Sequence, residues 1–96
     1  MKYIFYRIEC KDPNVKDCYV SATTDINKTI RKHTKRVYKN HPSKLYQCIR
    51  SNGYVSNWNI RLITEYETHT DEDITHILKH YILCYNANLN YEEEQL

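Results

Sequence analysis

The sequence predicts an α+β fold, a small three-stranded antiparallel sheet flanked by three helices in the order β-β-α-α-β-α. Three segments alternate apolar and polar residues at the two-residue period of strands, and three others repeat apolar residues at helical spacing. With 96 residues, of which 41% are hydrophobic, the chain has the length and apolar content of one domain. We expect this domain to span residues 1–90 and an acidic tail to span residues 91–96.

The expected strands are rich in aromatic and β-branched residues. The first covers Lys2–Cys10, with the sequence KYIFYRIEC, and a turn signal follows it at residues 12–14. The second, at residues 17–22, lies close enough along the chain to pair with the first in antiparallel fashion. The third covers residues 57–67, where polar neighbours separate Trp58, Ile60 and Leu62.

The expected helices have recognisable ends. Thr24 or Asp25 caps the first helix, whose apolar positions are Ile26, Ile30, His33 and Val37. The second follows the break at residues 41–43 and carries Leu45, Tyr46 and Ile49. Gly53, the only glycine of the chain, ends that helix. The last helix begins at Asp71, and its apolar stripe comprises Ile74, Ile77, Leu78, Tyr81, Ile82 and Tyr85.

The charges are distributed unevenly along the chain. The net charge is only +2, yet residues 26–64 contain no Asp or Glu and nine of the 14 Lys and Arg residues. A strongly basic side on a nearly neutral protein is typical of a domain that binds a polyanion. The alternative is an ordinary solvated helix face. The expected nucleic-acid-binding residues are Lys28, Arg31, Lys32, Lys35, Arg36, Lys39 and Lys44.

The four cysteines show no pattern of a metal site. No two of them form a CxxC pair, and no Glu follows His76 to complete an H-E-x-x-H motif with His80. We therefore predict no metal-binding residues. No apolar run is long enough to cross a membrane, and the N-terminus lacks the features of a signal peptide. These observations predict an intracellular chain, in the cytoplasm or nucleus of a host cell, with reduced thiols and no membrane contact.

Short motifs on the first two strands resemble those of a known family. Ile4-Phe5-Tyr6 and Tyr19-Val20-Ser21 correspond in position to its two name motifs, and residues 22–25 (ATTD) follow the second. A linking helix and a third strand come after them in the expected order. From about Lys2 to Asn90, the chain resembles the GIY-YIG nuclease domain. The family's fold agrees with the α+β arrangement expected above.

The resemblance implies four candidate catalytic residues. Tyr6 and Tyr19 match the tyrosines of the two motifs, His33 matches a histidine on the following helix, and Asn90 matches an asparagine after the last helix. In an active nuclease the phenols and the imidazole would activate the nucleophile, and the amide would orient a phosphate. The alternative is structural: tyrosines packed on the core with bonded hydroxyls, a half-buried histidine and an asparagine that caps or turns the backbone.

Two family residues have no counterpart here. The family's arginine falls at Thr29, which has no guanidinium to offset charge on a phosphate. Its metal-binding glutamate falls at Leu78, which has no oxygen to bind Mg²⁺. Residues 74–90 contain no Asp or Glu at all. The resemblance therefore implies a degenerate site with no cofactor, and Mg²⁺ is expected only if the domain is an active endonuclease.

Three functions remain open from the sequence. The favoured one is a catalytically degenerate GIY-YIG-like domain that binds nucleic acid, DNA in the first instance, mainly through phosphates and with weak sequence specificity. The second is an active, metal-dependent endonuclease with a shifted site. The third is a protein-interaction module or homodimer on the same scaffold. The frequent Ile, Asn, Lys and Tyr residues suit an A·T-rich genome, such as that of a virus or mobile element.

Overall fold

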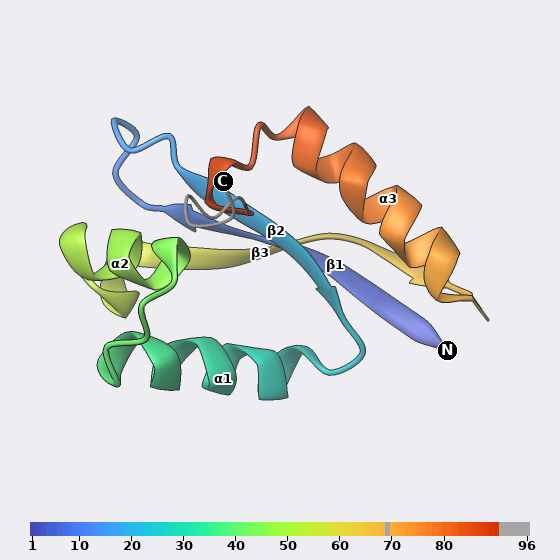
Figure 1. Cartoon of the computed structure of the whole chain (residues 1–96), viewed down its shortest axis with the longest axis horizontal. Coiled ribbons are helices and arrows are strands. Elements are labelled where there is room, and N and C mark those ends of the chain that lie inside the picture. Colours follow the sequence, from blue (N-terminus) through green and yellow to red (C-terminus); the bar gives the residue numbers. More distant parts are fainter. Residues whose placement is uncertain (69, 91–96) are drawn as a thin grey trace.

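Three strands and three α-helices follow one another in the predicted order β-β-α-α-β-α (Figure 1). The computed structural model describes residues 1–68 and 70–90. The predicted α+β class, with a three-stranded antiparallel sheet flanked by helices, is confirmed. The acidic tail expected at residues 91–96 lies outside the described residues. Within the described ranges, none of the helices has the length and apolar content needed to span a bilayer.

The first strand is the centre of the sheet. β1 (Lys2–Cys10) pairs on one side with β2 (Cys18–Thr23) and on the other with β3 (Trp58–Glu67), both antiparallel. The β1–β3 register shifts between Phe5 and Tyr6, which marks a bulge in this pair. The sheet order is therefore β2-β1-β3, and both outer strands have a free edge to protect.

The helices cover the two faces of the sheet unequally. α1 (Ile26–Tyr38) and α2 (Lys44–Ser51) lie on one face, and α3 (Asp71–Cys84) lies on the other (Figure 1). Successive side chains of a strand point to opposite faces. Tyr6 therefore belongs to the core under α1 and α2, whereas the ring of Phe5 packs 5.8 Å from that of Tyr81 on α3.

Each face has its own hydrophobic core. The larger core is built from β1, α1, α2, β3 and the chain after α3, with the buried residues Tyr6, Ile8, Cys10, Val37, Leu45, Tyr46, Ile49, Trp58 and Leu89. The smaller core joins β2 to α3 and to the chain after it. Its buried residues are Cys18, Val20 and Ala87, against which Ile63, Leu78, Tyr81, Ile82 and Tyr85 pack. The apolar stripe predicted for the last helix thus does face the sheet.

The inward face of α1 differs in part from the prediction. Asp25 caps the helix as expected and accepts a hydrogen bond from the Lys28 amide at 3.0 Å. The buried residues of α1 are Thr29, His33 and Val37, whereas Ile30 is 39% exposed. The Thr29 hydroxyl donates to Thr23 Oγ1 at 2.8 Å, which fixes this turn of the helix against the end of β2. Ile30 is therefore not one of the core positions of α1.

A tight connection joins α2 to β3. Gly53 follows the helix with φ +94°, as predicted for its C-terminal end, and an added Cβ would lie 2.7 Å from Asn57 Cβ. A short 3-10 turn, η1 (Val55–Asn57), leads into the strand. The indole N–H of buried Trp58 donates to the Asn52 carbonyl at 3.1 Å, which ties the start of β3 to the end of α2.

The outer edge of β2 is covered by side chains rather than by a strand. They come from a second 3-10 turn, η2 (Asn88–Asn90). The Asn90 amide accepts from the Val20 N–H at 2.9 Å and donates to the Val20 carbonyl at 2.7 Å. Asn88 Oδ1 accepts from the Cys18 N–H at 3.2 Å. These amides reproduce the hydrogen bonds of a neighbouring strand and protect this edge.

Candidate nucleic-acid interface

One face of α1 carries a row of exposed cations. We call the residues Lys28, Arg31, Lys32, Lys35, Arg36 and Lys39 the basic stripe; all six are exposed. The ion pairs between side chains in the described chain lie elsewhere: Lys2 with Glu65, and Arg7 and Arg61 with Glu9. No described carboxylate pairs with a stripe residue, so its positive charge is not neutralised within this part of the protein.

The stripe continues into a hollow at the C-terminal end of α1. The hollow measures about 540 Å³ and is lined by Lys32, Lys35, Arg36, Lys39, Asn40, His41 and Pro42. Partial burial and the neighbouring Arg36 lower the pKa of Lys32, as expected where cations crowd together. Lys44, the seventh predicted binding residue, is half-buried at the start of α2 and does not line this hollow.

One basic residue near the hollow has a structural task. The Arg50 guanidinium donates to the Val37 carbonyl at 3.1 Å and to the His41 carbonyl at 2.8 Å. These bonds satisfy carbonyls at the end of α1 and after it, which the helix itself cannot pair. Arg50 therefore holds the walls of the hollow together from α2, while the basic stripe faces outward.

Behind the stripe lies a buried chain of hydrogen bonds centred on His33. Its Nε2 is 2.8 Å from the Tyr6 hydroxyl, and its Nδ1 is 2.7 Å from the Tyr46 hydroxyl. Burial, together with Lys32 and Arg36, lowers the pKa of His33 to about 4. The neutral ring has one donor and one acceptor, so one phenol donates to His33 and the other accepts from it.

The two phenols that bond to His33 are also neutral. Burial raises the pKa of Tyr6 well above its usual value, and burial likewise raises the pKa of Tyr46 despite a contact with Arg36. The half-buried Tyr19 ring meets His33 edge-on, with the ring centroids 6.0 Å apart. The structure therefore brings together three of the four predicted catalytic residues, Tyr6, Tyr19 and His33.

Sequence reasoning missed the role of Tyr46. It treated this residue only as an apolar position of the second helix. Its ring is 3% exposed, and its hydroxyl completes the hydrogen bonding of His33 from α2. No spacing rule connects the two residues, since they lie on different helices. The signal that was available is chemical: a histidine on an inward helix face needs two polar partners.

The remaining predicted site residues lie elsewhere. Thr29 is buried one turn before His33 and bonds to Thr23, not to the tyrosines. Leu78 packs in the smaller core under α3, on the opposite face of the sheet from His33. The Asn90 amide bonds to the Val20 backbone at the sheet edge, through one accepted and one donated hydrogen bond. The six positions matched to the GIY-YIG motifs therefore do not all come together at one site. They are Tyr6, Tyr19, Thr29, His33, Leu78 and Asn90.

The residues at these positions do not fit a divalent metal. Leu78 offers no ligand atom, and its surroundings in the smaller core are apolar residues and a thiol. Within residues 1–68 and 70–90, no three His, Cys, Asp or Glu side chains gather in a group that could hold a metal ion. His80 contacts the Cys84 thiol at 3.5 Å on the exposed side of α3, but two such groups do not make a site.

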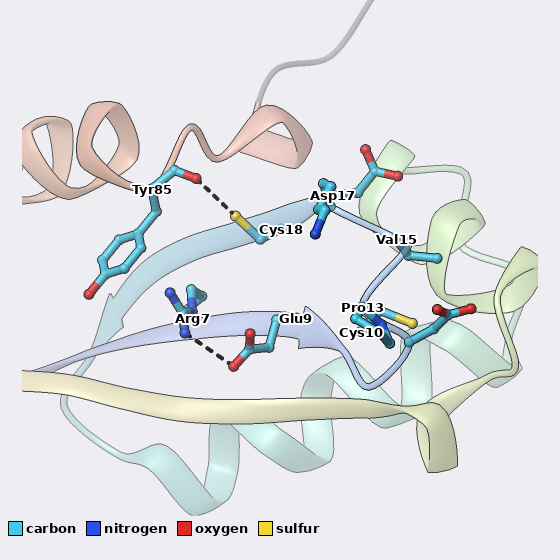
Figure 2. Close-up of a pocket in the computed structure, with 10 residues that line it drawn as sticks. Arg7, Glu9, Cys10, Pro13, Val15, Asp17, Cys18 and Tyr85 are labelled. Atoms are coloured by element: carbon cyan, nitrogen blue, oxygen red, sulfur yellow. Dashed lines mark hydrogen bonds and ion pairs between the residues drawn. The ribbon is translucent and has the colours of Figure 1, made fainter.

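A second hollow, on the α3 side of the sheet, has mixed charge. Figure 2 shows its walls, which enclose about 240 Å³ between β1, β2, their connecting loop and Tyr85. The Arg7 guanidinium lies 4.5 Å from the Tyr85 ring centroid and bonds to Glu9 at 3.2 Å. Asp12, Lys16 and Asp17 complete the charged lining. Carboxylates outnumber cations here, so this hollow suits a polyanion less well than the basic stripe.

On the α1 face, the basic stripe has no carboxylate partner among the described residues, and a neutral hydrogen-bonded cluster lies behind it. Cations of this kind bind phosphate oxygens, while the core fixes the helix that presents them. Comparison of the chain with protein-family profiles, with curated proteins and with solved structures finds no match.

Proposed function

We propose that this chain is a nucleic-acid-binding domain on a degenerate GIY-YIG-like scaffold, and that it contacts phosphates through the basic stripe without hydrolysing them. The observation that carries the proposal is the set of six exposed cations on one helix with no described carboxylate partner. An ordinary solvated helix of this length would be expected to carry both signs of charge. Over residues 26–64 the charged side chains of Lys and Arg are all positive, and there is no Asp or Glu.

The length of the stripe suits a phosphate backbone. Lys28 and Lys39 lie at its ends, which a rise of 1.5 Å per residue separates by roughly 16 Å. One strand of B-DNA places a phosphate every 3.4 Å along its axis, so the stripe spans about five of them. Contacts of this kind position a protein on nucleic acid but read little sequence. The expected binding is therefore salt-dependent and weakly specific.

Two features favour binding over cleavage. Thr29 cannot supply the positive charge, and Leu78 cannot supply the metal ligand, that a GIY-YIG-like mechanism needs. The tyrosine–histidine cluster argues for a nuclease-like ancestry. Its buried hydroxyls, however, are bonded to His33 rather than directed at a substrate. Mg²⁺ is therefore not expected to be a working cofactor.

The test compares two charge-matched double variants in a DNA-binding titration. Lys32→Gln with Lys35→Gln removes two stripe cations, and Lys16→Gln with Lys79→Gln removes two exposed cations elsewhere. We expect the first pair to weaken binding about tenfold or more at low salt, since two phosphate contacts are lost. The control pair should bind like the parent. Equal losses in both pairs, or no binding by the parent, would contradict the proposal.

The endonuclease alternative is tested on the same samples. The tyrosine–histidine cluster is the observation that favours it. Plasmid, branched and single-stranded substrates are incubated with Mg²⁺, Mn²⁺ or EDTA and run on denaturing gels. We expect the same substrate bands in all three conditions. Metal-dependent nicking that disappears in a Tyr19→Phe variant would establish the active nuclease and overturn the degenerate site.

A further inference from the structure

Two exposed tyrosine rings stack on each other beside the basic stripe. Tyr38 is the last residue of α1, and Tyr54 lies in the connection between α2 and β3. Their ring centroids are 5.8 Å apart with an interplanar angle of 19°. Tyr38 is 62% exposed and Tyr54 is 44% exposed, so neither ring contributes to a core. The end of α1 and the end of α2 lie at the same end of the molecule (Figure 1).

The backbone of Tyr54 is held in a conformation that suits glycine. Its φ of +60° and ψ of −167° belong to a region that side chains with a Cβ rarely enter. Two hydrogen bonds hold it there: its N–H donates to the Ile49 carbonyl at 2.9 Å, and its carbonyl accepts from the Asn57 N–H at 3.1 Å. A tyrosine at this position costs stability, and its ring stays partly exposed outside the hydrophobic cores. This combination is typical of a residue kept for contact with a ligand.

The charge around the ring pair selects the kind of ligand. Lys35 lies one helical turn before Tyr38, and Lys39 follows it directly. Both lysines line the basic hollow at the end of α1. A ligand that meets this surface carries negative charge and a flat ring at once. Nucleotides of a single strand have both, whereas a double helix keeps the faces of its bases stacked inside.

We infer that Tyr38 and Tyr54 form a stacking platform for an unpaired base, and that the preferred ligand of this domain is single-stranded nucleic acid. The inference rests on the proposed function, because the basic stripe supplies the phosphate contacts. A base stacks on the outer face of the ring pair and extends it. The strand then runs along α1 past Lys39 and Lys35 toward Lys28 at the other end of the stripe.

The test uses three probes of equal length: a single-stranded oligonucleotide, the same strand with abasic sites throughout, and a duplex. The abasic strand keeps every phosphate and loses every base. We expect the parent protein to bind the normal strand about tenfold more tightly than the abasic strand, since stacking on an aromatic side chain contributes on this scale. The duplex should bind no better than the abasic strand.

The variants are chosen so that the fold is kept. Tyr38→Leu places a good helix former at an exposed position. Tyr54→Gly removes the ring and adopts the observed backbone conformation without strain. Tyr66→Leu is the matched control, an exposed tyrosine on β3. We expect Tyr38→Leu and Tyr54→Gly to bind the normal strand as weakly as the abasic strand. Their melting temperatures should stay within a few degrees of the parent's.

The outcomes separate the inference from the proposed function. Equal binding of the normal and abasic strands by the parent would overturn the platform and leave the basic stripe in place. Tighter binding of the duplex than of the normal single strand would also overturn the platform and leave the basic stripe in place. Binding of none of the three probes would overturn the proposed function, and the platform with it. A loss in Tyr66→Leu equal to that in Tyr38→Leu would also contradict the platform.

Discussion

His33 is a titratable side chain held in a buried environment. It lies between two phenols, Tyr6 and Tyr46, and is 4% exposed. Because Lys32 and Arg36 are close by, a proton on the ring would be repelled as well as desolvated. The ring therefore stays neutral and serves as a structural hydrogen-bonding centre between β1, α1 and α2.

The stability of the fold should depend on this histidine between about pH 4 and 6.5. The folded pKa is about 4 and the ordinary value is 6.5, so the unfolded chain binds the proton first as the pH falls. The contribution of His33 is fully present above pH 6.5 and decreases toward pH 4. Between pH 7 and 5 we expect a loss of about 2 kcal/mol in the free energy of unfolding. Urea titrations at both pH values measure it.

His33→Gln is the matched variant for this prediction. Glutamine donates and accepts hydrogen bonds but does not titrate. The variant should be less stable than the parent at pH 7 and should lose less stability on going to pH 5. If the variant loses as much stability between pH 7 and pH 5 as the parent does, other groups, such as the carboxylates, cause the pH dependence.

The sequence predicted part of this cluster and not the rest. Tyr6, Tyr19 and His33 were identified together through the spacing of family motifs, and they do lie together. Tyr46 could not be linked to them, because its contact with His33 depends on how two helices pack. The Tyr38–Tyr54 stack was also missed, because it joins residues on either side of α2.

The elements are held in place at their ends and edges. Asp25 caps α1, as predicted. Thr70 caps α3, which begins at Asp71 as predicted, although the cap itself was not identified from the sequence. The edge of β2 is different, because its partner is the pair of asparagine side chains in η2. Sequence reasoning weighed Asn90 as a phosphate ligand or a turn residue. It could not foresee an amide that pairs with a strand.

Asn90→Asp should destabilise the fold through this edge. A carboxylate can still accept from the Val20 N–H but cannot donate to the Val20 carbonyl, which then faces a negative oxygen. We expect a decrease of about 1–3 kcal/mol in the free energy of unfolding. Thermal unfolding measures it. Asn14→Asp, at an exposed turn position, is the control with the same change of charge. Equal stability of the two variants would show that the Asn90 amide contributes no stability.

In the part of the chain that the structure describes, the basic stripe and an acidic helix start lie on opposite sides of the sheet. The basic stripe lies on α1, whereas Asp71, Glu72 and Asp73 form the first turn of α3. Figure 1 places these two helices on opposite faces of the sheet. The order of the elements followed from periodicity together with turn and cap signals, but this separation depends on how the elements pack around the sheet, which no local pattern encodes. A polyanion therefore meets the protein with α1 toward it.

The slope of binding affinity against salt concentration should report how many phosphates this face contacts. For single strands, the logarithm of the affinity is expected to fall with the logarithm of the salt concentration by about 0.7 per phosphate neutralised. Lys35→Gln should reduce that slope by about 0.7, and Lys79→Gln on α3 should leave it unchanged. Anisotropy titrations across a range of salt concentrations give both slopes. Identical slopes in the parent and Lys35→Gln would exclude Lys35 from the contact.

The placement of Trp58 gives the protein a built-in optical probe. It is the only tryptophan, and its indole is bonded to Asn52 at the connection that also carries Tyr54. A change in this connection alters the hydrogen bond and the polarity around the ring, and so shifts the emission spectrum. Binding that disturbs this connection should therefore change the intrinsic fluorescence of the unlabelled chain.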